Sequence, residues 1–400
     1  MRQASPKRLV VLASTFPVTL DDGIPAFVFD IADEEAREFD VTVLTPRVPG
    51  SAARETIGNV SVIRFRYFFR RWEDLADGAI LDNLKQKKSR WLQVGPLVLA
   101  QMVVLRRLIR TLKPDAIHAH WVIPQGLSAF VVGRRVPLLV TTHGGDIYAL
   151  NNPLVLAVKK RVLRRAASVS TVNAEMVRRL EGWGIDAAKI HMLPMGVPLN
   201  QAAAAKTGRE NQPGRLLVVG RLVEKKGITI LLDALRSHVA TPGWSLTIVG
   251  DGPIREALED QAKGLPVKFL GQLSRDEVLR EMAIASILVL PSISASSGDQ
   301  EGLPVVLLEA AAMGAAIVAS DLPGINEALT DGKTGLLVPQ QDPQALGAAI
   351  DRLLADEPLR AGIGAAAAVR ANDYSLTSIG LRYRDVVRNM ALDGNVRTRG

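Results

Sequence analysis

Two glutamates, Glu301 and Glu309, stand on either side of a turn that leads into an apolar run. A buried strand is expected just upstream, over 287–290, and Pro304 fits the first position of the following helix, where its missing N–H costs nothing. The free amides and the dipole of a helix N-terminus can bind a phosphate. A carboxylate beside such a site would instead accept hydrogen bonds from hydroxyls. Phosphate and hydroxyls together indicate a nucleotide sugar.

Either glutamate could also be ordinary, one solvated in a loop and the other on a helix surface. Against this, Glu309 lies within the run 305–312, which is apolar enough to predict burial. A charge is seldom buried without a partner. The surroundings of Glu309 therefore favour a binding role for the pair.

Cations are expected at the edge of the same sheet. Arg221 directly follows a predicted strand over 215–220, and Lys226 precedes a predicted helix over 228–235. Two cations there could clamp a diphosphate and neutralise the charge that builds on a leaving group. A solvated loop of charges is the alternative, and the anion expected beside the glutamates favours the clamp.

The first half of the chain contributes His143, which follows a predicted strand over 138–142 and precedes two glycines. It is placed to touch a reacting sugar, although a histidine is more often structural. His118 and His120 share one face of a strand by alternation. We see no third ligand for a metal, so we read them as structural or as lining an acceptor site. The Gly23 loop could bring backbone close to a phosphate.

Composition narrows the class of protein. The chain has 400 residues and no cysteine, which excludes disulfides and cysteine metal sites. The N-terminus does not read as a signal peptide. The most apolar stretch, over 92–105, is interrupted by polar residues, glycine and proline, and we judge it too short to span a membrane. We therefore expect a soluble, cytoplasmic protein.

The net charge of +8 is concentrated in basic clusters of the first half. The segment 64–72 interleaves arginines with aromatic residues, a composition that suits a bilayer interface. It suits equally an edge strand whose arginines face water. An anionic membrane surface is thus one expected partner, with the inner face of the cell membrane as the alternative location to free solution.

Strands alternate with helices through both halves, which predicts α/β domains with doubly wound parallel sheets. We expect a first Rossmann-like domain over 1–198, a linker over 199–214 and a second Rossmann-like domain over 215–375. A last helix at about 376–390 is expected to pack back on the first domain. Ligands of such sheets bind beyond the carboxyl ends of the strands, which would face a cleft between the domains.

The chain resembles glycosyltransferase family 4, the retaining GT-B transferases, over about residues 8 to 390. Glu301-x7-Glu309 is the most specific element. The other motifs that carry the resemblance are Gly220-Arg221-Leu222, Lys225-Lys226-Gly227, Thr142-His143-Gly144, Pro194-Met195-Gly196-Val197 and the run from Asp331 to Pro339. The Glu-Gly-Leu-Pro form at Glu301 resembles the bacterial polysaccharide-biosynthesis branch.

The resemblance implies roles for the donor-side residues. Arg221 and Lys226 would bind the donor diphosphate, Glu309 the donor ribose and Glu301 the transferred sugar. The backbone over 303–306 would help to hold the phosphate and sugar, through Leu303, Val305 and Val306. Pro304 stands where the family usually has glycine, and it removes one amide donor.

On the acceptor side, the resemblance implies that His143 lines the reaction centre and that Gly23 approaches the phosphates. The family needs no metal, and no Asp-x-Asp sequence occurs in this chain. We therefore expect no cofactor and no metal ligand, with the nucleotide diphosphate sugar as co-substrate.

We predict an enzyme that moves a hexosyl group, with retention, from a UDP- or GDP-linked sugar to a glycan or lipid-linked acceptor in polysaccharide or cell-envelope glycan synthesis. One alternative is a nucleotide-sugar hydrolase or epimerase on the same fold. Another is a non-enzymatic protein that binds anionic membrane or nucleic acid through the basic first half. The paired glutamates and the cationic clamp argue against nucleic acid, which requires neither.

Overall fold

The computed structural model describes residues 6–19, 26–78 and 80–397. The chain forms two compact units. The first unit contains residues 1–172, 176–194 and 377–400, and the second contains 173–175 and 195–376. The chain therefore passes between the units more than once, and its last helix belongs with its first strands.

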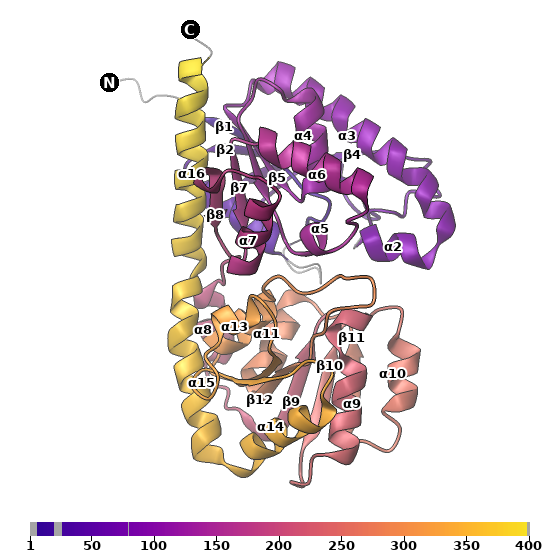
Figure 1. Ribbon diagram of the computed structural model, residues 1–400, viewed down its shortest axis with the longest axis vertical. Helices are drawn as coiled ribbons and strands as arrows, with labels where there is room; N and C mark the ends of the chain where they lie inside the picture. The colour runs from indigo at the N-terminus through magenta and orange to yellow at the C-terminus, as the bar shows by residue number, and fades with distance from the viewer. Residues whose placement is uncertain (1–5, 20–25, 79, 398–400) are drawn as a thin grey trace. The chain divides into compact units, whose positions relative to one another are not determined.

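The first unit is built on an eight-stranded sheet, with helices outside it (Figure 1). Its strands are β1 (Arg8–Leu12), β2 (Asp40–Pro46), β3 (Arg54–Ile57), β4 (Val60–Phe65), β5 (Ala116–His120), β6 (Leu138–Thr141), β7 (Ser168–Thr171) and β8 (Ile190–Met192). They lie in the order β3-β4-β2-β1-β5-β6-β7-β8. Among the strands described, β3 and β4 pair antiparallel and the other neighbours pair parallel.

The helices of the first unit include one from the far end of the sequence. They are α1 (Phe27–Glu35), α2 (Ile80–Gln86), α3 (Trp91–Leu112), α4 (Leu127–Val132), α5 (Gly145–Tyr148), α6 (Pro153–Arg165), α7 (Ala174–Gly182) and α16 (Leu376–Arg397). The α16 residue Arg384 pairs with Glu34 at 2.6 Å. The hydroxyl of Tyr383, which is fully buried, donates to the carbonyl of Leu193 at 3.1 Å. Helix α16 is thus part of the core of this unit.

The second unit has a six-stranded sheet in the order β11-β10-β9-β12-β13-β14, parallel throughout the part described. The strands are β9 (Gln212–Val219), β10 (Ser245–Val249), β11 (Val267–Gly271), β12 (Ala285–Leu290), β13 (Ala316–Ser320) and β14 (Leu336–Val338). Numbered within the unit, this is the 3-2-1-4-5-6 order of a Rossmann sheet.

Helices cover both faces of the second sheet. They are α8 (Leu199–Lys206), α9 (Ile228–Ser237), α10 (Arg255–Gln261), α11 (Arg275–Ile284), α12 (Val305–Ala312), α13 (Ile325–Ala328), α14 (Pro343–Ala355) and α15 (Glu357–Ala371). Consecutive residues of β9 enter different cores: Leu217 packs with the α12 side and Leu216 with the α9 side. A strand buried on both faces reads as an unbroken apolar run, because side chains alternate between its faces.

The expected domain boundaries need correction. The stretch 199–214, expected as a linker, belongs to the second unit, where it forms α8 and the start of β9. Ala202 is buried in the core there, and the Lys206 ammonium donates to the carbonyl of Ala283 at 3.0 Å. Before the chain enters the second unit at Met195, the last residue of the first unit is Pro194 rather than residue 198. The last helix continues to Arg397, well beyond the expected end near 390.

Segment 64–72 also differs from the edge strand that was one of its two expected forms. Arg64 lies in β4, between β2 and β3, and its guanidinium is buried. Its Nε donates to Glu55 at 2.7 Å, and Nη2 donates to the carbonyl of Pro17 at 2.5 Å. This arginine therefore does not face water, and the chain leaves the sheet at Phe65.

Helix α3 is longer than the interrupted sequence suggested. With the turn before it, it forms a helical stretch, Lys88–Leu112, that is long and apolar enough to cross a membrane by length and composition alone. The sequence-based judgement that the stretch is too short is therefore wrong. A core helix that packs inside a protein has the same length and composition. Leu97, Leu105 and Leu108 of α3 are buried, and the helix packs on β2, β4 and α4.

Candidate functional site

A glycine turn brings two loops of the second unit together. After β9 the chain makes a 3-10 turn at Glu224–Lys226 and reaches Gly227, whose φ is +62°. A Cβ on Gly227 would lie 1.8 Å from the carbonyl oxygen of Pro291. The backbone N–H of Ile293 donates to the carbonyl of Lys225 at 2.8 Å. The turn therefore lies directly against the segment that follows β12.

Side chains hold these two loops together. The Glu224 carboxylate accepts from the N–H of Ser296 at 2.8 Å and from its hydroxyl at 3.0 Å. Lys225 pairs with Asp299, Nζ to Oδ2, at 3.2 Å. Glu224 and Lys225 of one loop thus fix the other loop, and Glu301 of that second loop lies beside Lys226.

Glu301 is the centre of the charged cluster. Its Oε1 lies 3.1 Å from Nζ of Lys226 and 3.8 Å from Nζ of Lys225, and 12% of its side chain is exposed. Burial alone would raise the pKa of this carboxyl. The two ammonium groups outweigh burial, Lys226 more than Lys225, and lower the pKa to about 2. Glu301 is therefore a carboxylate at neutral pH, able to accept hydrogen bonds.

Helix α12 begins immediately after this cluster. Pro304 occupies the position before its first residue rather than the first position itself, so Val305 starts the helix. No side chain caps this end, and the amides of Val305 and Val306 lie in a first turn that lacks intrahelical partners. Leu303, by contrast, is a loop residue.

Glu309 lies on the second turn of α12, as expected, but it is partly exposed rather than buried. Leu307 and Leu308 take the fully buried positions of this helix instead. The correction follows from the helical period, which turns one side of even an apolar run away from the core.

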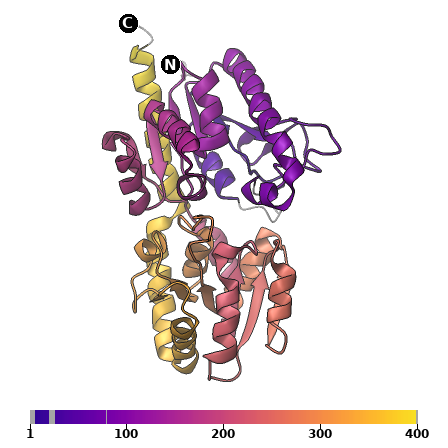
Figure 2. The same cartoon turned by 45° about the vertical axis from the view of Figure 1, so that its right-hand side comes forward.

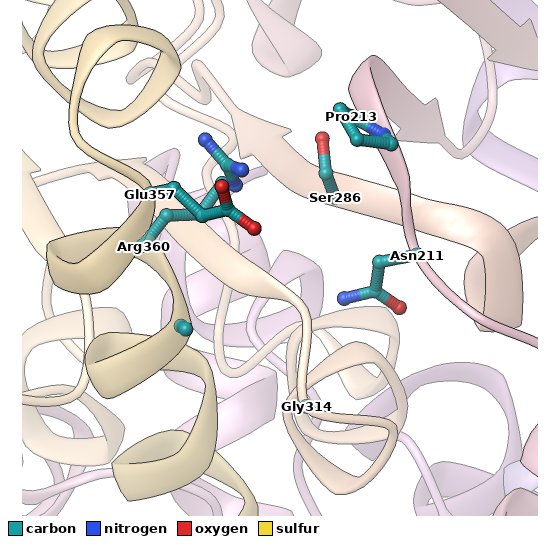
Figure 3. A pocket seen from close by; sticks show the side chains of 7 residues that line it. Asn211, Pro213, Ser286, Gly314, Glu357 and Arg360 are labelled. Carbon is teal, nitrogen blue, oxygen red and sulfur yellow. The ribbon is translucent and has the colours of Figure 1, made fainter.

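Arg221 directly follows Gly220 at the end of β9 and is partly buried. It therefore lies at the carboxyl edge of the sheet, the edge to which the Lys226 turn and the Glu301 loop also belong. A small hollow of the second unit lies elsewhere: Asn211, Ser286 and the α15 residues Glu357 and Arg360 line it (Figure 3). Ser286 is near the start of β12, so this hollow is at the amino edge.

In the first unit, the ends of β5 and β6 carry a pair of histidines. Nδ1 of His120 lies 3.0 Å from Nε2 of His143, and the rings are stacked at 5.2 Å. Asp146 joins the two strand ends, because its carboxylate accepts from the N–H of His143 at 2.9 Å and from the N–H of Val122 at 3.2 Å.

Aromatic rings surround this pair. The ring of His143 lies 4.7 Å from that of Trp121 and 5.1 Å from that of Phe27. Burial, with a smaller contribution from His118, lowers the pKa of His143 to about 3. Burial also holds the pKa of His120 well below its usual value. Both imidazoles are therefore neutral at physiological pH.

His118 belongs to the interior. It lies 2.8 Å from Glu35 and 2.7 Å from the hydroxyl of Thr141, and its ring stacks on Tyr383 of α16. This arrangement fits the structural role that was one of its two expected readings. Within the ranges that the structure describes, no group of three or more His, Cys, Asp or Glu residues is arranged to hold a metal ion.

The structure thus brings Lys226 and Glu301 into contact within one unit, with the start of α12 next to them in sequence. His143 lies in the other unit, and Gly23 lies outside the described residues. Sequence reasoning gave no role to Lys225, Asp299 or Asp146. Asp146 had a usable signal, since a carboxylate three residues after a strand-end histidine can accept from backbone amides there.

Comparison with known proteins adds family information. The profile described as Glycosyl transferases group 1 matches residues 200–370, and the Glycosyl transferase 4-like domain matches residues 23–196. A putative teichuronic acid biosynthesis glycosyltransferase, TuaC of Bacillus subtilis, is 32% identical over 376 residues, 86% of this chain and 88% of TuaC. The chain belongs to the group 1, family 4-type glycosyltransferases.

Other relatives of this glycosyltransferase match a shorter part of the chain or are more distant in sequence. Glycogen synthase of Mycobacterium tuberculosis is 32% identical over 266 residues, which are 63% of this chain and 63% of that protein. The crystal structure of Anabaena HepE in complex with UDP-glucose has a TM-score of 0.70 at 18% identity and covers 96% of this chain and 100% of HepE. The two parallel-sheet α/β units of this glycosyltransferase are those of the GT-B fold.

Proposed function

We propose that this glycosyltransferase moves a hexosyl group from a nucleotide diphosphate sugar to a glycan or lipid-linked acceptor, with retention of anomeric configuration and without a required metal ion. The observation that carries the proposal is the contact between Glu301 and Lys226 beside the start of α12. A cation, a carboxylate and the first amides of a helix at one sheet edge support the binding of a diphosphate together with a sugar.

In this proposal, Lys226 and Arg221 bind the diphosphate, assisted by the amides of Val305 and Val306. These fixed positive groups would also stabilise the charge that develops as the diphosphate leaves. They supply the charge that a metal ion would otherwise provide, which is why no metal is proposed. Pro304 has no N–H, so the phosphate contacts begin one residue later, at Val305.

The carboxylates would recognise hydroxyls. Glu301 would accept from the transferred sugar, and its lowered pKa keeps it ionised for that purpose at any physiological pH. Glu309, on the second turn of α12, would accept a hydrogen bond from a ribose hydroxyl. His143 would contact the sugar or acceptor as a neutral hydrogen-bonding group, given its pKa of about 3. It would therefore not serve as a charged acid.

The chemical step would proceed on one face of the sugar. The bond from C1 to the diphosphate oxygen breaks, and the acceptor hydroxyl oxygen bonds to C1 from the same side. Its proton passes to the leaving diphosphate, so no protein nucleophile is needed. UDP-glucose in the crystal of HepE supports a nucleotide-sugar donor, and the similarity to TuaC supports a place in bacterial polysaccharide synthesis.

Thermal stabilisation by UDP, GDP and ADP in EDTA would test the donor site, for the wild type and for Lys226→Ala. A ligand at 100 times its Kd stabilises the folded state by about 2.7 kcal/mol, a measurable shift. We expect one nucleotide to stabilise the wild type and to stabilise the variant much less. Equal stabilisation of both proteins would remove Lys226 from the site, and no stabilisation by any nucleotide would argue against the donor.

A further inference from the structure

Helix α3 exposes apolar side chains where a surface helix normally exposes polar ones. Leu92, Leu99 and Val103 are 73%, 63% and 69% exposed, and their spacing of seven and four residues places them on one face. The opposite, buried face includes Gln93 and Gln101, the latter fully buried. Because Leu97 and Leu105 are buried as well, α3 is apolar on both faces, whereas a helix on a water-exposed surface normally has a polar outer face.

The loop before α2 adds aromatic residues to the same end of the unit. Phe69 and Trp72 are 70% and 63% exposed, and their rings pack edge to face at 6.1 Å. The loop is fixed to the start of α3, because Gln93 donates to Asp74 at 2.7 Å and Arg90 donates to it at 3.0 Å. The buried glutamine therefore helps to hold exposed aromatic residues in place.

We call the apolar surface formed by these exposed side chains the α3 face: Leu92, Leu99, Val103, Trp91, Phe69 and Trp72. Basic side chains surround it. Arg106 and Arg110 continue the same stripe along the last turns of the helix and are exposed. The other exposed cations of α3, of the turn before it and of the aromatic loop are Arg66, Arg70, Arg71, Lys87, Lys88 and Arg107. Of the described acids in this loop, Asp74 is paired with Arg90 and Asp77 is exposed. The net charge around the face is positive.

We propose that the α3 face lies flat on an anionic bilayer, with its apolar side chains in the interface and its arginines and lysines on lipid phosphates. Exposed tryptophan and phenylalanine next to cations suit that environment. Each cation near such a surface contributes to binding. In both views α3 runs along the outside of the first unit, with its other side toward the sheet and α4 (Figures 1 and 2).

Two other uses of the face agree less well with the structure. Spanning the bilayer would require α3 to leave the sheet on which Leu97 and Leu105 are buried. A symmetric contact between two copies would bring the same cations of both copies together and cost binding energy by repulsion. The proposal does not depend on the sugar-transfer reaction, because none of its residues belongs to the candidate site.

Sedimentation with vesicles tests the proposal on the full chain. We expect binding to phosphatidylcholine vesicles that contain phosphatidylglycerol, at least tenfold weaker binding to pure phosphatidylcholine, and weakening by added salt. The double variant Leu99→Gln with Val103→Gln should bind the anionic vesicles at least tenfold more weakly. The reversal Arg106→Glu with Arg110→Glu should do the same.

Matched controls lie in the second unit, where Val369 is 72% exposed and Lys333 is exposed. Val369→Gln and Lys333→Glu should bind vesicles as the wild type does. All the altered side chains are exposed, so circular dichroism and thermal melts should be unchanged. Wild-type levels of binding by both α3 variants would overturn the proposal, as would equal binding of the wild type to neutral and anionic vesicles. A dimer in solution that Leu99→Gln with Val103→Gln dissociates, without vesicle binding, would also overturn it and assign the face to a second copy.

Discussion

The carboxyl edges of the two sheets differ in the charge state of their ionisable groups. In the second unit Glu301 and the neighbouring lysines are charged, since the ammonium groups lower the pKa of the carboxyl to about 2 despite its burial. In the first unit, burial lowers the pKa of His143 to about 3, and the ring is neutral. Desolvation acts on both groups, and at Glu301 the charges of Lys226 and Lys225 outweigh it. The two sheets thus end in one charged edge and one neutral edge.

The largest expected effect comes from removing the cation of the charged edge. Lys226→Ala should lower kcat by about 100- to 1000-fold, because one fixed group that stabilises the leaving diphosphate is lost. Steady-state kinetics with the donor sugar would measure this. Lys333→Ala, at an exposed position of the same unit, should keep near-normal turnover. If Lys226→Ala did so too, the clamp would be rejected.

Glu301→Gln should reduce transfer on the order of 100-fold, by analogy with the loss of one fixed catalytic group. The affinity for the nucleotide diphosphate alone should not fall, because a neutral amide competes less for Lys226 than the carboxylate does. Calorimetry with the nucleotide, beside kcat, separates the two. Normal turnover would remove Glu301 from the mechanism, and parallel loss of affinity and turnover would assign it to diphosphate binding.

Gly227→Ala tests the turn that assembles the charged edge. The substitution places a Cβ 1.8 Å from the carbonyl oxygen of Pro291 and forces alanine into a left-handed φ of +62°. We expect a loss of about 1–3 kcal/mol in the free energy of unfolding, with weaker nucleotide binding. Gly332→Ala has a similar φ of +69° with open space around it, so it isolates the backbone strain from the clash. Equal destabilisation by both would show that the close approach to Pro291 is unimportant.

His143→Asn should lower turnover only about 3- to 10-fold, the worth of one neutral hydrogen bond. Because the pKa of His143 is about 3, kcat between pH 5.5 and 8 should show no step that this variant removes. A step near pH 6.5 that disappears in the variant would mean that His143 titrates during the reaction, and the contrast between the two edges would then fail.

The smallest expected effect is on how the free energy of unfolding depends on pH. The folded-state pKa of His143 lies below its ordinary value of 6.5, so the unfolded chain takes up a proton first and stability falls as pH drops from 6.5 toward 3. His120 acts in the same direction. The lowered pKa of Glu301 causes a corresponding loss of stability as the pH falls from 4.5 toward 2. Urea unfolding of His143→Asn should therefore depend less on pH between 6.5 and 5 than wild type does. Identical slopes would contradict the lowered pKa.

The sequence predicted the two sheets well, because buried parallel strands read as apolar runs. The strands expected over 138–142 and 287–290 fall on β6 and β12. The β3–β4 hairpin was missed, since Arg64 looked like a solvent-facing residue until its contacts with Glu55 and Pro17 were known. Composition also misled at 199–214, where small and polar residues form α8 against a core that only the tertiary fold supplies.

For the site, the residue types predicted the charged edge, and the fold supplied its assembly. The proximity of Lys226 and Glu301 depends on the close approach of Gly227 to Pro291, which links positions more than sixty residues apart in sequence. The neutral state of His143 could not be predicted either. It depends on Trp121, Phe27 and His120 packing around the ring, and none of these is a sequence neighbour within the same strand.

The assignment of α16 to the first unit bears on how the protein is made. Because synthesis runs from the N-terminus, β1 emerges first, whereas the helix that fills the core of its unit emerges only after the whole second unit. The slot for Tyr383, which is fully buried in the finished protein, stays open during that interval. The second unit can thus complete its own core while the first still waits for the last stretch of chain. A nascent chain stopped at residue 376 should accordingly resist protease in its later half and be cut in its earlier one.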